Sequence, residues 1–415
     1  MERRGVQEGV RLEQEVRSIL VNVRRNGDHA LIHYTRLFDG VKIRAERIRV
    51  RRDEIDRAYE KVPHDFLGTL KKAARRIQRF HRSVSRGTLF QQIKEDEDGI
   101  RLGQMIRPLE RVGIYVPGGK ASYPSTVLMA AIPAKVAGVQ RVVMTTPPQR
   151  EGISPAILVA ADLAGVDEIY RAGGAQAIGA LAYGTSSIPR VDKIVGPGNR
   201  YVAMAKRLVY GAVDIDMVAG PSEIVIIADG KTPASFVAAD LISQAEHDEM
   251  AVAILITISK EYGEEVRREL KRQLPSLKRE KIAYESLTRR GAILIVNNLD
   301  QAVELANRIA PEHLELSLLN ARSLLKKLRH AGALFLGAYT AEAIGDYMAG
   351  PNHILPTAGT ARFSSPLGVE DFIKRTNVMS FTQGALRRFE KDVKRFTEWE
   401  GLEGHYRSIQ VRMKK

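Results

Sequence analysis

The sequence predicts an α/β protein with two Rossmann-like, doubly wound parallel-sheet domains, a helical N-terminal region and a small C-terminal helical hairpin. Three observations lead to this fold class. The first part of the chain has helical periodicity, short aliphatic segments alternate with Ala-rich segments from Arg111 onward, and an amphipathic hairpin follows them. Strands that alternate with helices are typical of parallel sheets. A chain of 415 residues is long enough for two or three domains.

The N-terminal region is predicted to be mainly helical over about the first hundred residues. Residues 10–25 and 52–86 place apolar side chains three and four positions apart among Lys, Arg and Glu. This is the spacing of a helix that buries one face. We expect the region to be a scaffold, preceded by an extension at residues 1–10.

Strands are predicted in the rest of the chain at residues 112–116, 141–145, 168–171, 193–195, 224–228, 253–257 and 292–296. Gly and Pro are concentrated between Pro117 and Pro221, which indicates a unit inserted into, or packed beside, the rest. The expected division is a larger α/β domain of residues 11–114 and 223–367, an inserted α/β domain of residues 115–222, and a tail of residues 368–415.

The tail is predicted to be helical. Leu386, Phe389, Val393 and Phe396 line one face of a helix that Gly401 can cap, and a second short helix covers residues 405–411. A hairpin of this size cannot bury its own apolar face. We therefore expect it to dock on the main body or on another subunit.

Composition excludes several classes of site. The chain has no cysteine, so disulfides, thiol nucleophiles and thiolate metal sites are absent, and any metal must take nitrogen and oxygen ligands. The net charge of +15 raises the possibility of a nucleic-acid partner, but the basic residues alternate with acids and lack an aromatic stacking motif. The longest apolar runs are far shorter than the roughly 20 residues of a membrane span, and residues 1–4 do not begin a secretory signal. We expect a cytoplasmic protein with no nucleic-acid or membrane partner.

Two segments contain candidate metal ligands. Gln244 and His247 are three residues apart in a helix-like stretch, so both side chains lie on one face. Asp346 and His353 flank a Gly-Pro turn that can hold them rigidly. Imidazole, carboxylate and amide groups suit zinc or a similar divalent ion. Each segment alone is equally compatible with an ordinary polar helix face or loop.

An acid and a histidine are adjacent in the segment PEH. Glu312 and His313 follow Pro311 and could act as a general-base pair, although a polar turn at a helix end would look the same. Glu400 and His405 lie in the C-terminal hairpin. Either could complete an active site in a partner subunit if the hairpin reaches one.

Three glycine-rich turns follow predicted strands, the position where α/β proteins bind ligands. Residues 117–120 resemble a P-loop but lack its spacing and its Ser or Thr, while residues 196–199 and 173–176 lack the third glycine of the dinucleotide fingerprint. Together they favour a ligand crevice with an incomplete dinucleotide fingerprint.

Taken together, these segments resemble the histidinol dehydrogenase family from about Arg111 to His405. The matching stretches are VGIYVPGGKASYPSTVLM, GGAQAIGALAYGT, VDKIVGPGN, DMVAGPSE, DLISQAEHD, APEHLEL, GDYMAGPNHILPT and EGLEGH. Their order and spacing also agree with the family.

The resemblance implies an activity and a set of roles. It implies four-electron oxidation of L-histidinol to L-histidine through bound L-histidinaldehyde, with two NAD and one zinc per subunit, in the last steps of histidine biosynthesis. It also implies a homodimer with shared active sites, in which the larger domain carries the metal and catalytic residues, the inserted domain binds NAD and the tail completes the partner's site. The implied roles are catalysis by Glu312 and His313; NAD contacts from Tyr115, Gln176 and Asn199; zinc binding by Gln244, His247, Asp346 and the partner subunit's His405; and substrate contacts from Ser222, His313, His353, Glu400 and the four zinc ligands.

Three alternatives are open at this point. A related zinc- and NAD-dependent dehydrogenase of another polyol, such as a sulfopropanediol, would share the scaffold, but Glu400 would repel a sulfonate. A nucleic-acid-binding protein would have no need of Gln244, His247 or Asp346. A degenerate homologue without activity is disfavoured because every implied ligand and the Glu312–His313 pair are present.

Overall fold

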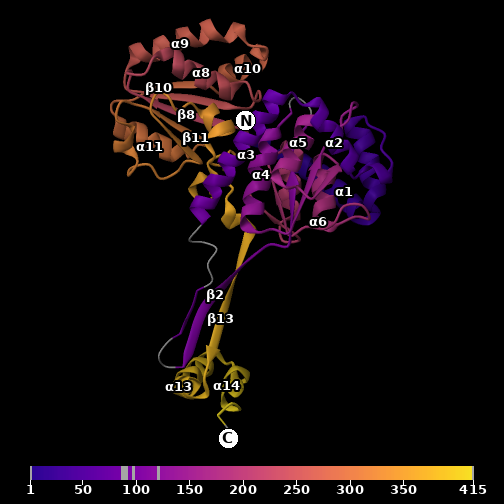
Figure 1. The fold of residues 1–415 in the computed structure, drawn as a ribbon. Helices are drawn as coiled ribbons and strands as arrows, with labels where there is room; N and C mark the ends of the chain where they lie inside the picture. Colours follow the sequence, from indigo (N-terminus) through magenta and orange to yellow (C-terminus); the bar gives the residue numbers. More distant parts are fainter. Residues whose placement is uncertain (1, 86–91, 96–98, 119–121, 414–415) are drawn as a thin grey trace. The chain divides into compact units, whose positions relative to one another are not determined.

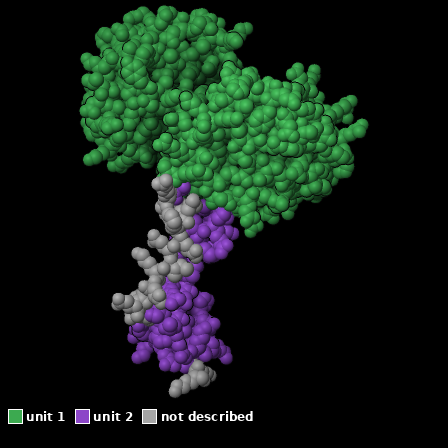
Figure 2. Space-filling model, in the orientation of Figure 1, with its two compact units in different colours: residues 1–84, 109–372 green, residues 85–108, 373–415 purple. Residues whose placement is uncertain are grey.

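The computed structural model describes residues 2–85, 92–95, 99–118 and 122–413. Contacts divide the chain into two compact units, which Figure 2 shows in different colours. The first consists of residues 1–84 and 109–372, and the second of residues 85–108 and 373–415.

The first unit contains two parallel five-stranded sheets, and the first of these has the strand order β5-β4-β3-β6-β7. Its strands are β3 (Arg111–Tyr115), β4 (Arg141–Thr146), β5 (Glu168–Arg171), β6 (Lys193–Val195) and β7 (Asp214–Ile215); its helices are α4 (Pro124–Ala137), α5 (Pro155–Ala164), α6 (Gly174–Tyr183) and α7 (Arg200–Val209). Helices α4 and α5 pack together, as do α6 and α7. The winding direction reverses between β3 and β6, which makes their carboxyl ends the switch point of the sheet.

The second sheet repeats this topology with the order β10-β9-β8-β11-β12, again all parallel. Its strands are β8 (Glu223–Ala228), β9 (Val252–Thr257), β10 (Ala292–Ile295), β11 (His313–Ser317) and β12 (Ala333–Leu336); its helices are α8 (Ala234–Ala245), α9 (Lys260–Gln273), α10 (Glu280–Arg290) and α11 (Leu299–Ile309). Ile224 and Ile226 of β8 belong to the core under α8 and α9, whereas Val225 and Ile227 belong to the core under α11. Both faces are therefore covered, and the predicted pair of doubly wound sheets is confirmed (Figure 1).

The N-terminal region is helical as predicted, with α1 (Glu2–Tyr34), α2 (Arg52–Lys61) and α3 (His64–Val84). The helical pattern predicted over residues 52–86 belongs to two helices, α2 and α3, because the chain is extended at Val62, where the following Pro63 disfavours the helical conformation. Helix α1 contains a break at Gly27 and packs against α6 and α7 of the first sheet. It therefore forms an outer layer on that sheet.

The second unit combines an antiparallel sheet with two helices. Strand β2 (Ile100–Pro108) lies between β1 (Gln92–Glu95) and β13 (Ile373–Phe381), and α13 (Gln383–Glu400) and α14 (Glu403–Gln410) follow. The hairpin was predicted, and Gly401 ends α13 at φ 68° as expected. The prediction that the whole tail is helical was wrong, because β13 pairs along its whole length with β2, some 270 residues earlier in the chain. The domain boundaries drawn from the sequence stay a prediction.

Short helical segments complete the chain: η1 (Thr35–Asp39), η2 (Ala45–Arg47), η4 (Leu274–Ser276), η5 (Ala321–Leu324), α12 (Glu342–Ile344), η6 (Gly345–Ala349), η7 (Thr360–Arg362) and η8 (Val369–Phe372). Among the described residues, none of the helices has both the length and the apolar character of a membrane span.

Candidate active site

The candidate active site lies at the amino-terminal edge of the second sheet. Ser222 immediately precedes β8, and Glu312 and His313 stand at the start of β11, which pairs with β8 in parallel. Two adjacent strands thus begin side by side at this edge. Ligands of open α/β sheets usually bind at the carboxyl edge. This site lies instead at an amino-terminal edge, unlike the glycine-rich turns of the first sheet.

His313 is buried, with 4% of its surface exposed. Its Nδ1 lies 3.0 Å from the main-chain oxygen of Glu223. Because a carbonyl can only accept a hydrogen bond, Nδ1 carries the proton and Nε2 keeps its lone pair. Burial lowers the pKa of His313 to about 3, so the ring is neutral near pH 7 and Nε2 is available as a base.

Glu312 is also buried, and its Oε2 accepts a hydrogen bond of 2.9 Å from the backbone N–H of Glu223. Burial raises the pKa of this carboxyl well above its usual range. Its Oε2 is 3.7 Å from Nδ1 of His313, which is too long for a hydrogen bond. The acid and the histidine are therefore neighbours, each held separately by the backbone of Glu223.

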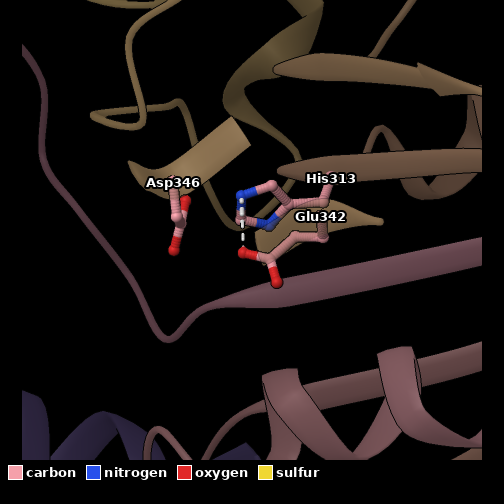
Figure 3. A group of neighbouring side chains, drawn as sticks. All are labelled: His313, Glu342 and Asp346. Atoms are coloured by element: carbon pink, nitrogen blue, oxygen red, sulfur yellow. Dashed lines mark ion pairs between the residues drawn. The ribbon is translucent and has the colours of Figure 1, made fainter. Parts of the chain in front are cut away.

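Glu342 and Asp346 approach His313 from α12 and η6 (Figure 3). Glu342 Oε1 is 3.7 Å from His313 Nε2, and a ligand atom of each of these three residues lies within 4.8 Å of the others. Burial raises the pKa of Glu342 to about 8 and that of Asp346 to about 6, and the charge of Asp346 adds to the effect on Glu342. Glu342 was not predicted from the sequence, although its position four residues before Asp346 is a spacing that places two side chains on one helix face.

Gln244 and His247 lie together at the end of α8, as their spacing predicts. Gln244 is completely buried, and its Nε2 is 3.4 Å from Nδ1 of His247. Burial lowers the pKa of His247. The Oε1 atom of Gln244 has no hydrogen-bond partner in the described part of the chain, and an unpaired buried carbonyl is costly.

His353 connects the two sheets of the unit. Its Nδ1 lies 3.0 Å from the main-chain oxygen of Asp346 and its Nε2 3.3 Å from Thr126 Oγ1 of α4. Burial lowers its pKa to about 4, and a charge on either His353 or His247 would lower the pKa of His313 further. The three histidines are thus close enough to interact electrostatically.

The donor set fits a divalent cation. Gln244 Oε1 and Glu342 Oε1 are buried oxygens without hydrogen-bond partners among the residues described, and a bound cation would compensate for the lost hydration. Nitrogen from imidazole and oxygen from amide and carboxylate are suitable zinc ligands. Asp346 and His247 supply the remaining ligand types that the sequence predicted.

The residues predicted to contact the cofactor lie at the carboxyl edge of the first sheet, whereas Glu312 and His313 lie at the amino-terminal edge of the second sheet. Tyr115 ends β3, Gln176 lies in the first turn of α6 after β5, and Asn199 caps α7 after β6 through hydrogen bonds to two backbone N–H groups. The Tyr115 hydroxyl accepts a hydrogen bond of 3.1 Å from Gly174 N–H. Both amide atoms of Gln176 are buried and unpaired within the described segments. In the third predicted turn, Gly119 and Lys120 lie outside the described residues.

Glu400 and His405 belong to the second unit. Glu400 is the last residue of α13, His405 lies on α14, and both are exposed. The roles predicted for these two residues stay predictions.

Two doubly wound sheets, a buried acid and histidine, and a cluster of nitrogen and oxygen ligands are the features of an α/β enzyme with a candidate metal site. The family model for histidinol dehydrogenase matches residues 2–413. The chain is 55% identical over 401 residues to the histidinol dehydrogenase of Bacillus anthracis, and the alignment covers 97% of this chain and 92% of that one. It is 52% identical over 412 residues to the histidinol dehydrogenase of Geobacter sulfurreducens, where the alignment covers 99% of this chain and 95% of that one.

The solved structure of histidinol dehydrogenase from Elizabethkingia anophelis superimposes with a TM-score of 0.91 at 38% identity, covering 97% of this chain and 92% of that one. The chain belongs to the histidinol dehydrogenase family. The family resemblance predicted from the sequence is thereby confirmed, and the sulfopropanediol alternative is not favoured.

Proposed function

We propose that this enzyme oxidises L-histidinol to L-histidine in two NAD-dependent steps, with L-histidinaldehyde bound between them. The observation that carries the proposal is the buried, neutral His313, whose Nε2 is free to accept a proton within the cluster of candidate metal ligands. This activity would place the enzyme in cytoplasmic histidine biosynthesis.

His313 is the proposed base for the substrate hydroxyl. A neutral imidazole can accept the proton through Nε2, while Nδ1 remains hydrogen-bonded to Glu223 and so fixes the ring orientation. Glu312 has a raised pKa, which suits a carboxyl that takes and returns a proton. In the second half-reaction, Glu312 and His313 would activate the water that adds to the aldehyde.

Gln244, His247 and Asp346 would hold zinc in one subunit, and the partner subunit's His405 would complete the protein ligand set. When bound, zinc supplies orientation, because histidinol offers an amine and an imidazole nitrogen that can coordinate it. Ser222, His353 and Glu400 would contact the substrate, and the carboxylate of Glu400 suits its imidazole end.

Tyr115, Gln176 and Asn199 would contact NAD at the carboxyl edge of the first sheet. NAD, when bound, accepts hydride from the substrate carbon in each step. The unpaired amide of buried Gln176 supports this assignment, because a bound cofactor would supply the missing hydrogen bonds.

The shared site would require a homodimer. The second unit exposes Phe396 and Trp399 on α13, at 70% and 93%, and large exposed apolar side chains are typical of interaction surfaces. Solution mass tests this assembly, and a stable, active monomer would contradict it.

The test of the activity is NADH formation from L-histidinol with excess NAD, measured before and after the metal is removed by a chelator and after zinc is restored. We expect two NADH per histidinol, loss of activity with the metal and recovery with zinc. A folded, zinc-loaded enzyme that forms no NADH from histidinol would refute the proposal.

A further inference from the structure

A lysine and an aspartate form a fully buried ion pair behind one of the glycine-rich turns. Lys206 of α7 contacts Asp216, which follows β7, and their side chains are 2% and 0% exposed. Burying two charges is costly, and a pair of apolar side chains of similar volume is often as stable or more stable. Stability of the fold alone therefore does not explain why a charged pair occupies this position.

Both charged groups bind the same glycine. Lys206 Nζ donates a hydrogen bond of 3.0 Å to the main-chain oxygen of Gly196, and Gly196 N–H donates one of 2.8 Å to Asp216 Oδ2. The other carboxyl oxygen, Oδ1, accepts a hydrogen bond from Met217 N–H at 2.6 Å and also contacts Lys206. The pair thus fixes the peptide groups on both sides of Gly196.

Gly196 begins the turn that ends at Asn199. Its φ is +112°, a conformation that favours glycine, and a Cβ placed on it would lie 2.2 Å from the main-chain oxygen of Tyr115. The turn therefore touches the end of β3 at the switch point of the first sheet. Asn199 ends the turn that Gly196 begins, and the main-chain oxygen of Tyr115 lies against Gly196, so two of the predicted NAD contacts adjoin this glycine.

We infer that Lys206 and Asp216 are positioning residues for the dinucleotide. They hold the turn of residues 196–199 against β3, in the conformation that lets its backbone approach NAD. An apolar pair could fill the same space but could not hold the N–H and the C=O of Gly196. The inference rests on the proposed NAD site and adds to it two residues that do not themselves contact the cofactor.

The test compares two double variants. Lys206→Met with Asp216→Leu removes both charges, so that no lone charge is left buried. Lys193→Met with Asp214→Leu is the matched control, because this pair, at 2.9 Å, joins the amino-terminal ends of β6 and β7, the edge away from the turn. Each protein is assayed for thermal midpoint, for the Kd of NADH by fluorescence, and for KM and kcat.

We expect the Lys206/Asp216 variant to remain folded, with KM for NAD and Kd for NADH raised roughly 10- to 100-fold, the cost of misplacing a binding group by about 1 Å. KM for histidinol should change little, and the control should bind NADH like the wild type. A folded variant with unchanged NADH binding would overturn the inference.

A second variant covers the possibility that the double variant does not fold. Lys206→Met with Asp216→Asn keeps the volume of Asp216 and leaves no lone charge, but an amide N–H then faces one of the two backbone donors, Gly196 or Met217; this variant should show the same selective loss of NADH affinity. Loss of folding in both would overturn the inference, because the pair would then serve stability. A wild-type enzyme that binds no NADH would instead refute the proposed cofactor site itself.

Discussion

The substitution Gly196→Ala isolates the contribution of the 196–199 turn. The new Cβ would lie 2.2 Å from Tyr115 O, and real Cβ atoms stay at least 3.0 Å from their neighbours, so the turn must move by about 3.0 − 2.2 = 0.8 Å. A non-glycine residue at φ +112° also adds strain of about 1–3 kcal/mol. A displacement near 1 Å costs up to about 100-fold in a positioned reaction. We therefore expect KM for NAD to rise by roughly 10- to 100-fold.

Gly211→Ala provides the control for backbone strain. Gly211 has φ +98°, but a Cβ there would meet no atom within 4 Å. Both variants should lose a few degrees of thermal midpoint, whereas only Gly196→Ala should lose affinity for NAD. Steady-state kinetics with varied NAD and a thermal melt separate the two effects. If Gly196→Ala and Gly211→Ala bind NAD equally well, the turn does not contribute to the cofactor site.

Other predictions concern the second sheet. Glu342→Gln should lower kcat roughly 10- to 100-fold while the protein remains folded, since partners of a reacting group typically contribute this much; an unchanged kcat would show that Glu342 does not influence His313. His313→Ala should keep its metal, as measured by elemental analysis, and lose roughly 100-fold or more in kcat, whereas His247→Ala should lose the metal. Mixed His405→Ala and His313→Ala subunits should recover part of the activity, and no recovery after demonstrated subunit exchange would contradict the shared site. Burial raises the pKa of Glu315 to about 9, so this side chain stabilises the fold fully below its unfolded pKa near 4.5 and loses that contribution as pH rises towards 9. In the metal-free enzyme, Glu315→Gln should therefore lose less thermal stability between pH 5 and pH 9 than the wild type, and equal slopes would refute the assignment.

Local sequence patterns predicted the parts of the fold that depend on local interactions. Strands β3, β4, β5 and β6 of the first sheet and the hairpin cap at Gly401 were found because aliphatic runs and terminal glycines are local features, whereas the two-residue β7 was missed. Strand β13 was missed because its stability comes from β2, far away in the chain. Its segment IKRTNVMSF shows no alternation that would indicate a strand by itself.

The candidate site likewise contains some residues whose placement local patterns predicted and others whose placement depends on distant contacts. The spacing of Gln244 and His247 predicted that they would lie on one face, and they do. By contrast, the approach of Glu342 to His313 depends on how α12 packs over the start of β11, which no local pattern encodes. The family resemblance supplied roles but not this neighbour.

Burial keeps the imidazole of His313 neutral. Desolvation disfavours the charged ring and outweighs the hydrogen bond to the Glu223 carbonyl, which by itself raises the pKa of His313 but fixes the proton on Nδ1. A nearby carboxylate would oppose this by favouring imidazolium, but burial raises the pKa of Glu342 to about 8, so its carboxyl is largely uncharged near neutral pH in the metal-free protein. The same low-polarity environment therefore removes the charge from the acid and from the base. Nε2 is left as an unprotonated acceptor at the point where a substrate hydroxyl must give up its proton.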